Sequence, residues 1–184
     1  MDTGNRISEI QRKLEGKTGY DYYNSFQHAV EEYCSDKKSA KPKAILAAPA
    51  NEIERKYNTD GFNAFVKKFG TSLSLGSVKK QKIYLPEGAN FEISINPAFS
   101  VEKGGVKKVF LPWLIQKPEL NQKYGAVACY VMQQAYKSTN LGNCQFNIVD
   151  FVAGKIYSQN QITNNTKLIV NSDSKTISDL LGSL

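Results

Sequence analysis

The stretch from residue 82 to residue 157 constrains the fold most, because its hydrophobic pattern changes from strand-like to helix-like and back. In FEISINP (91–97), Phe91, Ile93 and Ile95 alternate with polar residues, which is typical of a strand buried on one face. The whole stretch predicts three strands, a helix and a further strand. These are KIYLP (82–86), FEISINP (91–97), VKKVFLPWL (106–114), LNQKYGAVACYVMQQAY (120–136) and QFNIVDFVAGKIYS (145–158).

Helical spacing also dominates the residues before this stretch. An amphipathic helix is predicted over 20–34, and a second helical pattern covers 51–69. Within it, residues 58–60 supply Asn, Thr and Asp as N-caps, which predicts that the helix divides in two. After the stretch, a further strand is predicted around 167–170, followed by a short terminal helix.

The length and composition are typical of one domain, because the chain has 184 residues, 41% of them hydrophobic, and no long linker. We therefore expect residues 1–184 to form a single α/β (α+β) domain, a sandwich whose central mixed sheet is flanked by helices. Residues 1–18 are polar and are expected to form a mobile arm or a short helix. Pro112 removes a backbone N–H, which predicts that its strand is bent or lies at a sheet edge.

Basic residues outnumber acidic ones, and the formal net charge of +7 favours acidic partners such as nucleic acid. No apolar run approaches the roughly 20 residues that cross a bilayer, and the N-terminus lacks the apolar core of a secretory signal. We expect a cytoplasmic protein without a membrane partner. The candidate nucleic-acid-binding residues are lysines in two clusters: Lys79, Lys80, Lys82, Lys107 and Lys108.

The chain lacks most of the residue patterns that catalytic sites need. His28 is the only histidine, so a metal site with two or three histidine ligands from one chain is excluded, and a catalytic triad would have to use His28. Neither GxxxxGK[ST] nor GxGxxG is present, which excludes nucleotide binding of those two kinds. Cys34, Cys129 and Cys144 form no CxxC pair and are expected to be reduced thiols.

The chemistry that remains is that of carboxylates. Glu92 lies on the polar face of 91–97, Glu102 lies beside a Gly-Gly turn, and Lys108 lies in the next strand. Mg²⁺ binds one or two carboxylates together with phosphate oxygens, and a lysine stabilises charge that develops on phosphate. If Glu92, Glu102 and Lys108 share a cleft, they form a candidate catalytic site with Mg²⁺ as its cofactor. The alternative is that Glu92 is the solvent-side residue of a half-buried strand.

The order helix, three antiparallel strands, helix, strand over about residues 51–158 resembles the core of the restriction-endonuclease-like, or PD-(D/E)xK, nuclease superfamily. This resemblance implies a mixed α/β sandwich whose active members bind Mg²⁺ and hydrolyse phosphodiesters. The family places an acid at the end of its second core strand and E-x-K on its third. Here Asn96-Pro97 ends 91–97, and no acid stands two residues before Lys107 or Lys108. The resemblance therefore implies a degenerate member that keeps the fold.

Three functions are left open by the sequence. The first is a non-catalytic or accessory nucleic-acid-binding protein with a nuclease-like fold, as the basic excess and the incomplete motif indicate. The second is an active Mg²⁺-dependent nuclease. The third is a protein-interaction subunit without chemistry, pairing with itself or with another protein, because Pro112, Trp113 and Leu114 resemble an aromatic anchor of the kind found in interfaces.

Overall fold

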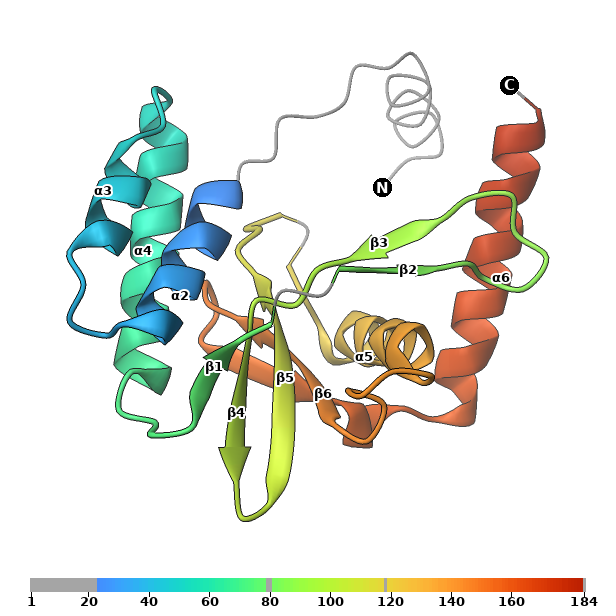
Figure 1. Ribbon diagram of the computed structural model, residues 1–184. Coiled ribbons are helices and arrows are strands. Elements are labelled where there is room, and N and C mark those ends of the chain that lie inside the picture. The colour runs from blue at the N-terminus through green and yellow to red at the C-terminus, as the bar shows by residue number, and fades with distance from the viewer. Residues whose placement is uncertain (1–22, 79–80, 118, 184) are drawn as a thin grey trace.

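The computed structural model describes residues 23–78, 81–117 and 119–183, and a mixed five-stranded sheet forms its centre (Figure 1). In spatial order the strands are β1 (Leu75–Ser77), β4 (Phe99–Lys103), β5 (Val106–Trp113), β6 (Gln145–Asp150) and β7 (Lys155–Ser158). Neighbouring strands are antiparallel except β5 and β6, which are parallel. A parallel pair needs a crossover, and a helix supplies it. The expected mixed α/β sheet is confirmed.

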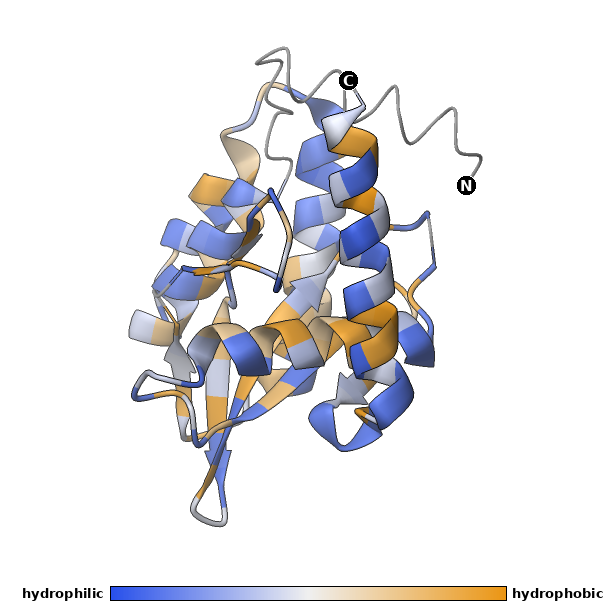
Figure 2. Cartoon of the chain, turned by 90° about the vertical axis from the view of Figure 1, so that its right-hand side faces the viewer, coloured by the Kyte–Doolittle hydropathy of each residue, from blue (hydrophilic) through white to orange (hydrophobic). Residues whose placement is uncertain are grey.

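Helices cover both faces of this sheet. On one face lie α2 (Asn24–Ser35), α3 (Lys41–Ala47) and α4 (Glu52–Phe69). On the other lie α5 (Gln122–Tyr136), which makes the crossover, and α6 (Asn164–Gly182), together with the hairpin of β2 (Lys82–Tyr84) and β3 (Ile93–Ile95). A short 3₁₀ helix, η1 (Gln159–Gln161), joins β7 to α6. Figure 2 shows apolar and polar residues mixed along α5 and α6, as expected for helices buried on one side.

Each face of the sheet has its own apolar core. The core beneath α2–α4 is rich in phenylalanine, and the rings of Phe99 on β4 and Phe110 on β5 stack with centroids 4.9 Å apart. Phe65 of α4 packs edge-on against Phe99. The core beneath α5 is mainly aliphatic, with Ile148 of β6 and Met132 of α5 fully buried. The sheet is thus packed against helices on both faces, and this packing holds its strands, including their ends, in place.

One helical prediction and one strand prediction are wrong. The helix expected to divide near residue 58 is continuous: Asn51 caps α4 by accepting from the backbone N–H groups of Ile53 and Glu54, and the side chain of Asn58 donates to Ser25 rather than capping a second helix. The strand expected around 167–170 is part of α6. Thr163 begins this helix with a capping box, and the capping box overrides the strand preference of the β-branched residues that follow.

The strands of 82–86 and 91–97 exist in part, but they pair with each other outside the main sheet. Pro97 has no N–H for a ladder and separates this hairpin from β4, which the sequence did not predict. The expected last strand is also divided. Asp150 accepts from the backbone N–H groups of Val152 and Ala153 and turns the chain between β6 and β7.

Pro112 does not lie in an edge strand, which corrects that expectation. β5 runs between β4 and β6, and Pro112 is in register with Val149 of β6. The carbonyl of Phe110 accepts from Ala98 on the β4 side, and the nitrogen of Pro112 points to that same side. β4 begins at Phe99, opposite Phe110, so it does not extend as far as Pro112. The missing N–H of Pro112 therefore removes no hydrogen bond between β4 and β5.

The expected arm, residues 1–18, lies outside the described residues. Among the helices that the structure describes, none combines the length and the apolar character needed to cross a bilayer.

Candidate functional site

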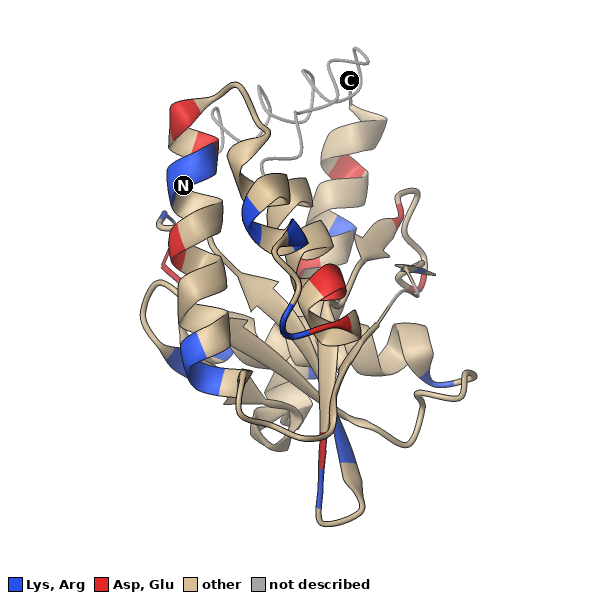
Figure 3. Ribbon diagram, turned by 60° about the vertical axis from the view of Figure 1, so that its left-hand side comes forward, with Lys and Arg blue, Asp and Glu red and all other residues tan. Residues whose placement is uncertain are grey.

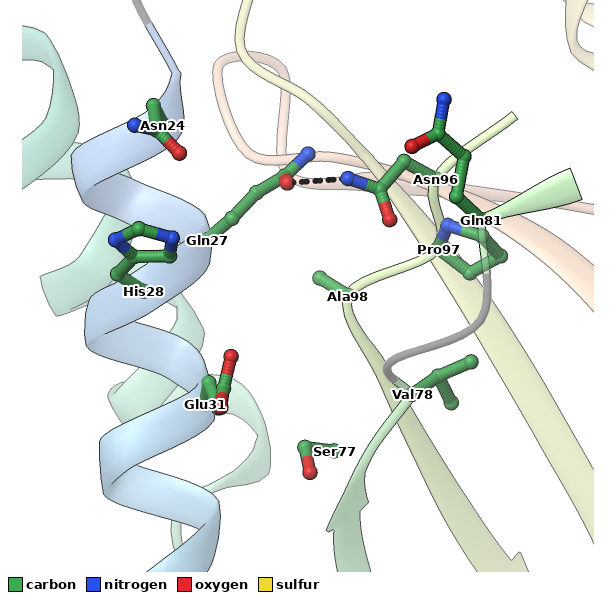
Figure 4. A pocket seen from close by; sticks show the side chains of 10 residues that line it. All are labelled: Asn24, Gln27, His28, Glu31, Ser77, Val78, Gln81, Asn96, Pro97 and Ala98. Carbon is green, nitrogen blue, oxygen red and sulfur yellow. Dashed lines mark hydrogen bonds between the residues drawn. The ribbon is translucent and has the colours of Figure 1, made fainter. Parts of the chain in front are cut away.

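A polar cleft of about 270 Å³ opens between α2 and the start of β4 (Figure 4). One wall is the polar face of α2, where Asn24, Gln27, His28 and Glu31 follow one another at helical spacing. The opposite face of the helix is buried in the phenylalanine-rich core. This amphipathic pattern is what turns four polar side chains toward the cleft.

The second wall comes from the segments that enter and leave the sheet edge. Ser77 ends β1 and Val78 follows it, and Asn96 to Ala98 lead into β4. Asn96 Nδ2 donates to Gln27 Oε1 at 2.6 Å, so an amide pair bridges the two walls (Figure 4). Val78 N donates to Ala98 O and ties the second wall together. The cleft is therefore held in shape by contacts between residues far apart in the sequence.

A buried polar cluster between α2 and α4 fixes the position of α2 on the side away from the cleft. Asn58 of α4 donates to Ser25 Oγ at 2.6 Å, and Ser25 donates to Glu54 Oε1 at 3.4 Å. Glu54 is only 2% exposed, and its Oε2 has no hydrogen-bond partner in the part of the chain that the structure describes. The hydrogen bonds of Ser25 with Asn58 and Glu54 join α2 to α4 in one register, because a shift of either helix would break both of them.

The chemistry of this cleft is mainly hydrogen bonding. Amides from Asn24, Gln27, Gln81 and Asn96 supply donors and acceptors, and Glu31 is the only carboxylate among the lining residues. Across residues 23–78, 81–117 and 119–183, no group of three or more His, Cys, Asp or Glu side chains is arranged to hold a metal ion. The arrangement is suited to recognising a polar ligand rather than to assembling a metal centre.

His28 and Ser77, which line the cleft, do not form a catalytic pair, and Cys34 on the same helix is not an activated thiol. Figure 4 shows the His28 imidazole well away from the Ser77 hydroxyl. Cys34, on the last turns of α2, is half-buried, and this burial raises the pKa of its thiol to about 11, with Lys37 opposing the shift and Glu31 adding to it. A thiol with such a pKa stays protonated near neutral pH and is a poor nucleophile.

The structure does not bring Glu92, Glu102 and Lys108 together. Glu92 is exposed just before β3, in the hairpin outside the main sheet. Glu102 is in register with Lys107, while Lys108 is in register with Val101. Directly paired residues share a face of the sheet, so Glu102 and Lys108 point to opposite faces. The three residues therefore do not form one cleft, because alternation along β5 separates them.

The predicted nucleic-acid-binding lysines that the structure describes lie in two separate hairpins. Lys79 and Lys80 lie outside the described residues, and Lys82 lies in β2. Lys107 and Lys108 lie on β5 in the β4–β5 hairpin, which projects from the body of the molecule (Figures 1 and 3). We call the hairpin residues 101–108 the basic ribbon. Its tip turns through Gly104 and Gly105, whose φ angles of 60° and 75° favour glycine.

Sequence reasoning missed both walls of the cleft and the pairing that makes the ribbon. The polar spacing along 24–31 was a usable signal, because it lies opposite the apolar residues of the same helix. From the sequence, Asn96 stood out only because the family pattern has an acid there. Its contact with Gln27 joins residues that are 69 positions apart. Contacts of that range leave no local mark in a sequence.

Comparison of this chain with protein-family models, with curated proteins and with solved structures found no match.

Proposed function

We propose that this protein is a non-catalytic, accessory nucleic-acid-binding protein, and that the basic ribbon is its contact surface. The observation that carries the proposal is the projection of this ribbon, on which residues 102–107 are all exposed. A two-stranded β-ribbon fits the major groove of duplex DNA, and lysines on it neutralise phosphates. The surplus of basic residues over the whole chain favours the same partner.

The surplus positive charge of the ribbon lies on one of its two faces. Lys107 shares one face with Glu102, and Lys103 shares the other with Lys108. With three lysines and one glutamate, the ribbon is a net cation, and the face that carries Lys103 and Lys108 is the one that meets phosphates. Val106 lies at the tip, 37% exposed, where an apolar side chain contacts a base edge such as the thymine methyl group.

A nuclease-like core is part of the proposal. Of the elements on which the resemblance rests, the helix α4, the strand β5, the crossover helix α5 and the parallel strand β6 follow one another in the expected order, whereas 82–86 and 91–97 form the separate β2–β3 hairpin and β1 and β4 fill the sheet beside β5. Asn96, which ends the segment 91–97, lies between β3 and β4 and lines the polar cleft. An amide rather than a carboxylate at this position supports binding rather than Mg²⁺-dependent cleavage. Three unpaired cysteines are consistent with a reducing cytoplasm.

The test is the salt dependence of binding in a Lys107→Gln/Lys108→Gln variant. We expect wild-type protein to bind a 20-base-pair DNA at low salt, with affinity falling steeply as salt rises. Loss of two phosphate contacts lowers the slope of log K against log salt by roughly 2 and weakens binding by at least about tenfold. Fluorescence anisotropy of a labelled duplex measures both quantities.

Lys175→Gln is the matched control, because Lys175 lies on α6 and already pairs with Asp179 at 3.0 Å. It should change neither the affinity nor the slope by more than a small amount. Flat titrations of wild-type protein at low salt, or an equal loss in the Lys175 variant, would reject the ribbon as the contact surface. Cleavage of the duplex in Mg²⁺ or Mn²⁺ would reject the non-catalytic assignment.

A further inference from the structure

A turn and the end of a helix lie beside the base of the basic ribbon and are bonded to it. The turn 70–74, between α4 and β1, lies at the same end of the molecule as the ribbon, and α2 ends beside this turn (Figure 1). Ser74 Oγ accepts from Glu102 N at 3.1 Å and donates to Glu102 O. Lys37, just after α2, donates to Ser72 O. These contacts join the end of α2, the turn and the ribbon into one unit.

The surface formed by this unit carries surplus positive charge of its own. We call residues 35–38 and 67–74 the basic shoulder. Figure 3 shows the basic end of α4 and the ribbon toward the same end of the molecule. The shoulder leaves a surplus of three positive charges, because it holds four exposed lysines and one aspartate: Lys37, Lys38, Lys67, Lys68 and Asp36.

Two of the shoulder lysines are engaged with backbone carbonyls. Lys37 donates to Ser72 O, and Lys68 donates to Gly154 O at 2.8 Å. Both contacts hold the ends of α2 and α4 in place. Lys38 and Lys67 are the two exposed lysines that these contacts leave to meet phosphates.

The phosphate-facing side of the ribbon is the side on which the shoulder lies. Lys108 is in register with Val101, and Val101 packs against the phenylalanine-rich core beneath α2–α4. Lys103 and Val106 form the next pair on that face, nearer the tip. The surplus charge of the ribbon therefore lies on the side of the sheet that α2 and α4 cover, where the shoulder adds its own charge.

An apolar side chain stands within this positive surface. Leu73, in the turn of the shoulder, has a relative exposure of 102%. The residues on both sides of it are held, because Ser72 N donates to Phe69 O at 2.9 Å and Ser74 bonds to the ribbon. A leucine that contacts nothing in its own fold adds little to folding. On a fixed turn it is already ordered for contact with a partner, which lowers the entropy cost of binding.

Duplex DNA has the shape and the charge that match these two surfaces. Two strands roughly 4.8 Å apart fit a major groove about 12 Å wide, and phosphates border that groove where the base of the ribbon lies. The major groove of duplex RNA is deep and narrow and does not admit a ribbon. A single strand presents one backbone, so it cannot border the ribbon on both sides.

We propose that the basic ribbon and the basic shoulder together bind one B-form DNA duplex. The ribbon lies in the major groove, Lys38 and Lys67 contact phosphates of a strand that borders it, and Leu73 packs against the sugars of that strand. This inference rests on the nucleic-acid-binding function proposed above. It specifies the substrate as double-stranded DNA, in preference to double-stranded RNA or single strands.

The experiment measures fluorescence anisotropy of three labelled probes over a series of salt concentrations. The probes are a 20-base-pair DNA duplex, an RNA duplex of the same sequence and one of the DNA strands alone. Two variants of the full-length protein alter the shoulder: Lys38→Gln/Lys67→Gln removes two charges, and Leu73→Ser removes the apolar side chain. All three side chains are exposed, so neither variant disturbs the core.

α5 and α6, on the other face of the sheet, supply the matched controls. Lys123→Gln/Lys167→Gln removes the same amount of charge from exposed positions on these two helices. Leu168→Ser replaces a leucine of α6 that is 65% exposed. Both controls should bind the DNA duplex nearly as wild-type protein does.

We expect the Lys38/Lys67 variant to lower the slope of log K against log salt by roughly 2 on the DNA duplex. Leu73→Ser should weaken binding by about tenfold and leave the slope unchanged, because an apolar contact releases no counterions. Wild-type protein should bind the DNA duplex at least about tenfold more tightly than the RNA duplex or the single strand.

Three results would overturn the inference: an unchanged slope in the Lys38/Lys67 variant, wild-type affinity in the Leu73 variant, or equal affinity for the three probes. The proposed function would survive any of them if the Lys107→Gln/Lys108→Gln variant still lost affinity, since the ribbon alone would then be the contact surface. Failure of wild-type protein to bind any probe at low salt would instead reject the function itself, and this inference with it.

Discussion

At the scale of single residues, Cys34 offers a direct test of how α2 is packed. Burial raises the pKa of its thiol from 9.0 to about 11, even though Lys37 acts in the opposite direction. At pH 8 the thiolate fraction is then about 100-fold smaller than that of an ordinary thiol, and the thiolate is the reacting species. We expect alkylation of the native protein by iodoacetamide to be slower by about that factor, and to accelerate up to a pH near 11.

Mass spectrometry of the alkylated protein identifies which cysteine has reacted, and Cys34→Ser is the control. The other two thiols, Cys129 and Cys144, are buried and should react only after unfolding. Modification of Cys34 at pH 8 at the rate of a free thiol would contradict the packing of α2 described above.

At the scale of elements, the contact between α5 and β7 depends on Gly125. A Cβ added there would lie 2.5 Å from Cγ and 2.6 Å from Cβ of Tyr157, which are the least movable atoms of that side chain. Tyr157 is also held by its hydroxyl, which donates to Leu120 O at 2.8 Å. We expect Gly125→Ala to destabilise the protein by about 2 kcal/mol, despite the gain of up to about 1 kcal/mol in helix propensity.

Chemical denaturation measures this difference, and Gly182→Ala is the control within a helix, since a Cβ there meets nothing within 4 Å. The control should leave stability unchanged or slightly higher. If both variants behaved alike, α5 would not approach β7 as closely as the structure indicates.

The elements also show what the sequence can and cannot predict. The helix 120–136 was predicted well, since α5 spans Gln122–Tyr136, because its apolar spacing is unbroken. The strand at 167–170 was wrong because three consecutive apolar residues look strand-like, whereas the capping box at Thr163 and the continuing spacing decide for a helix. The separation of the β2–β3 hairpin from the main sheet depends on which strands meet in space, and alternation alone does not encode this.

The candidate site was still harder to predict. The three residues proposed for catalysis, Glu92, Glu102 and Lys108, were grouped by proximity in the sequence, and strand register separates them. The ribbon lysines were found because charge is visible in composition. The amides of the cleft were not, because Asn and Gln are ordinary surface residues until the fold brings Gln27 and Asn96 together.

At the scale of the whole molecule, β4 connects the polar cleft to the basic ribbon. The segment that enters β4 forms a wall of the cleft, and the turn that leaves it forms the tip of the basic ribbon. The two surfaces therefore lie at opposite ends of one short strand within a sheet that is packed on both faces.

The stability of the whole molecule is expected to fall at alkaline pH. Burial raises the pKa of the Cys129 thiol from 9.0 to about 12, and burial raises the pKa of Tyr136 from 10.0 to about 12. Below pH 9 both folded and unfolded chains hold the Cys129 proton, and the stabilisation is fully present. Between pH 9 and 12 only the folded chain keeps it, so the free energy of unfolding falls by up to about 1.4 kcal/mol per pH unit for this thiol.

Urea denaturation at pH 8, 9, 10 and 11 measures this slope, and Cys129→Ala separates its cause from general alkaline damage. The variant loses packing in the core and should be less stable than wild type at pH 8, because Cys129 is fully buried. Its stability should nevertheless decline less steeply with pH, since the group that unfolding deprotonates is gone. Parallel declines in the two proteins would show that Cys129 does not ionise on unfolding, and would contradict its burial between α5 and the sheet.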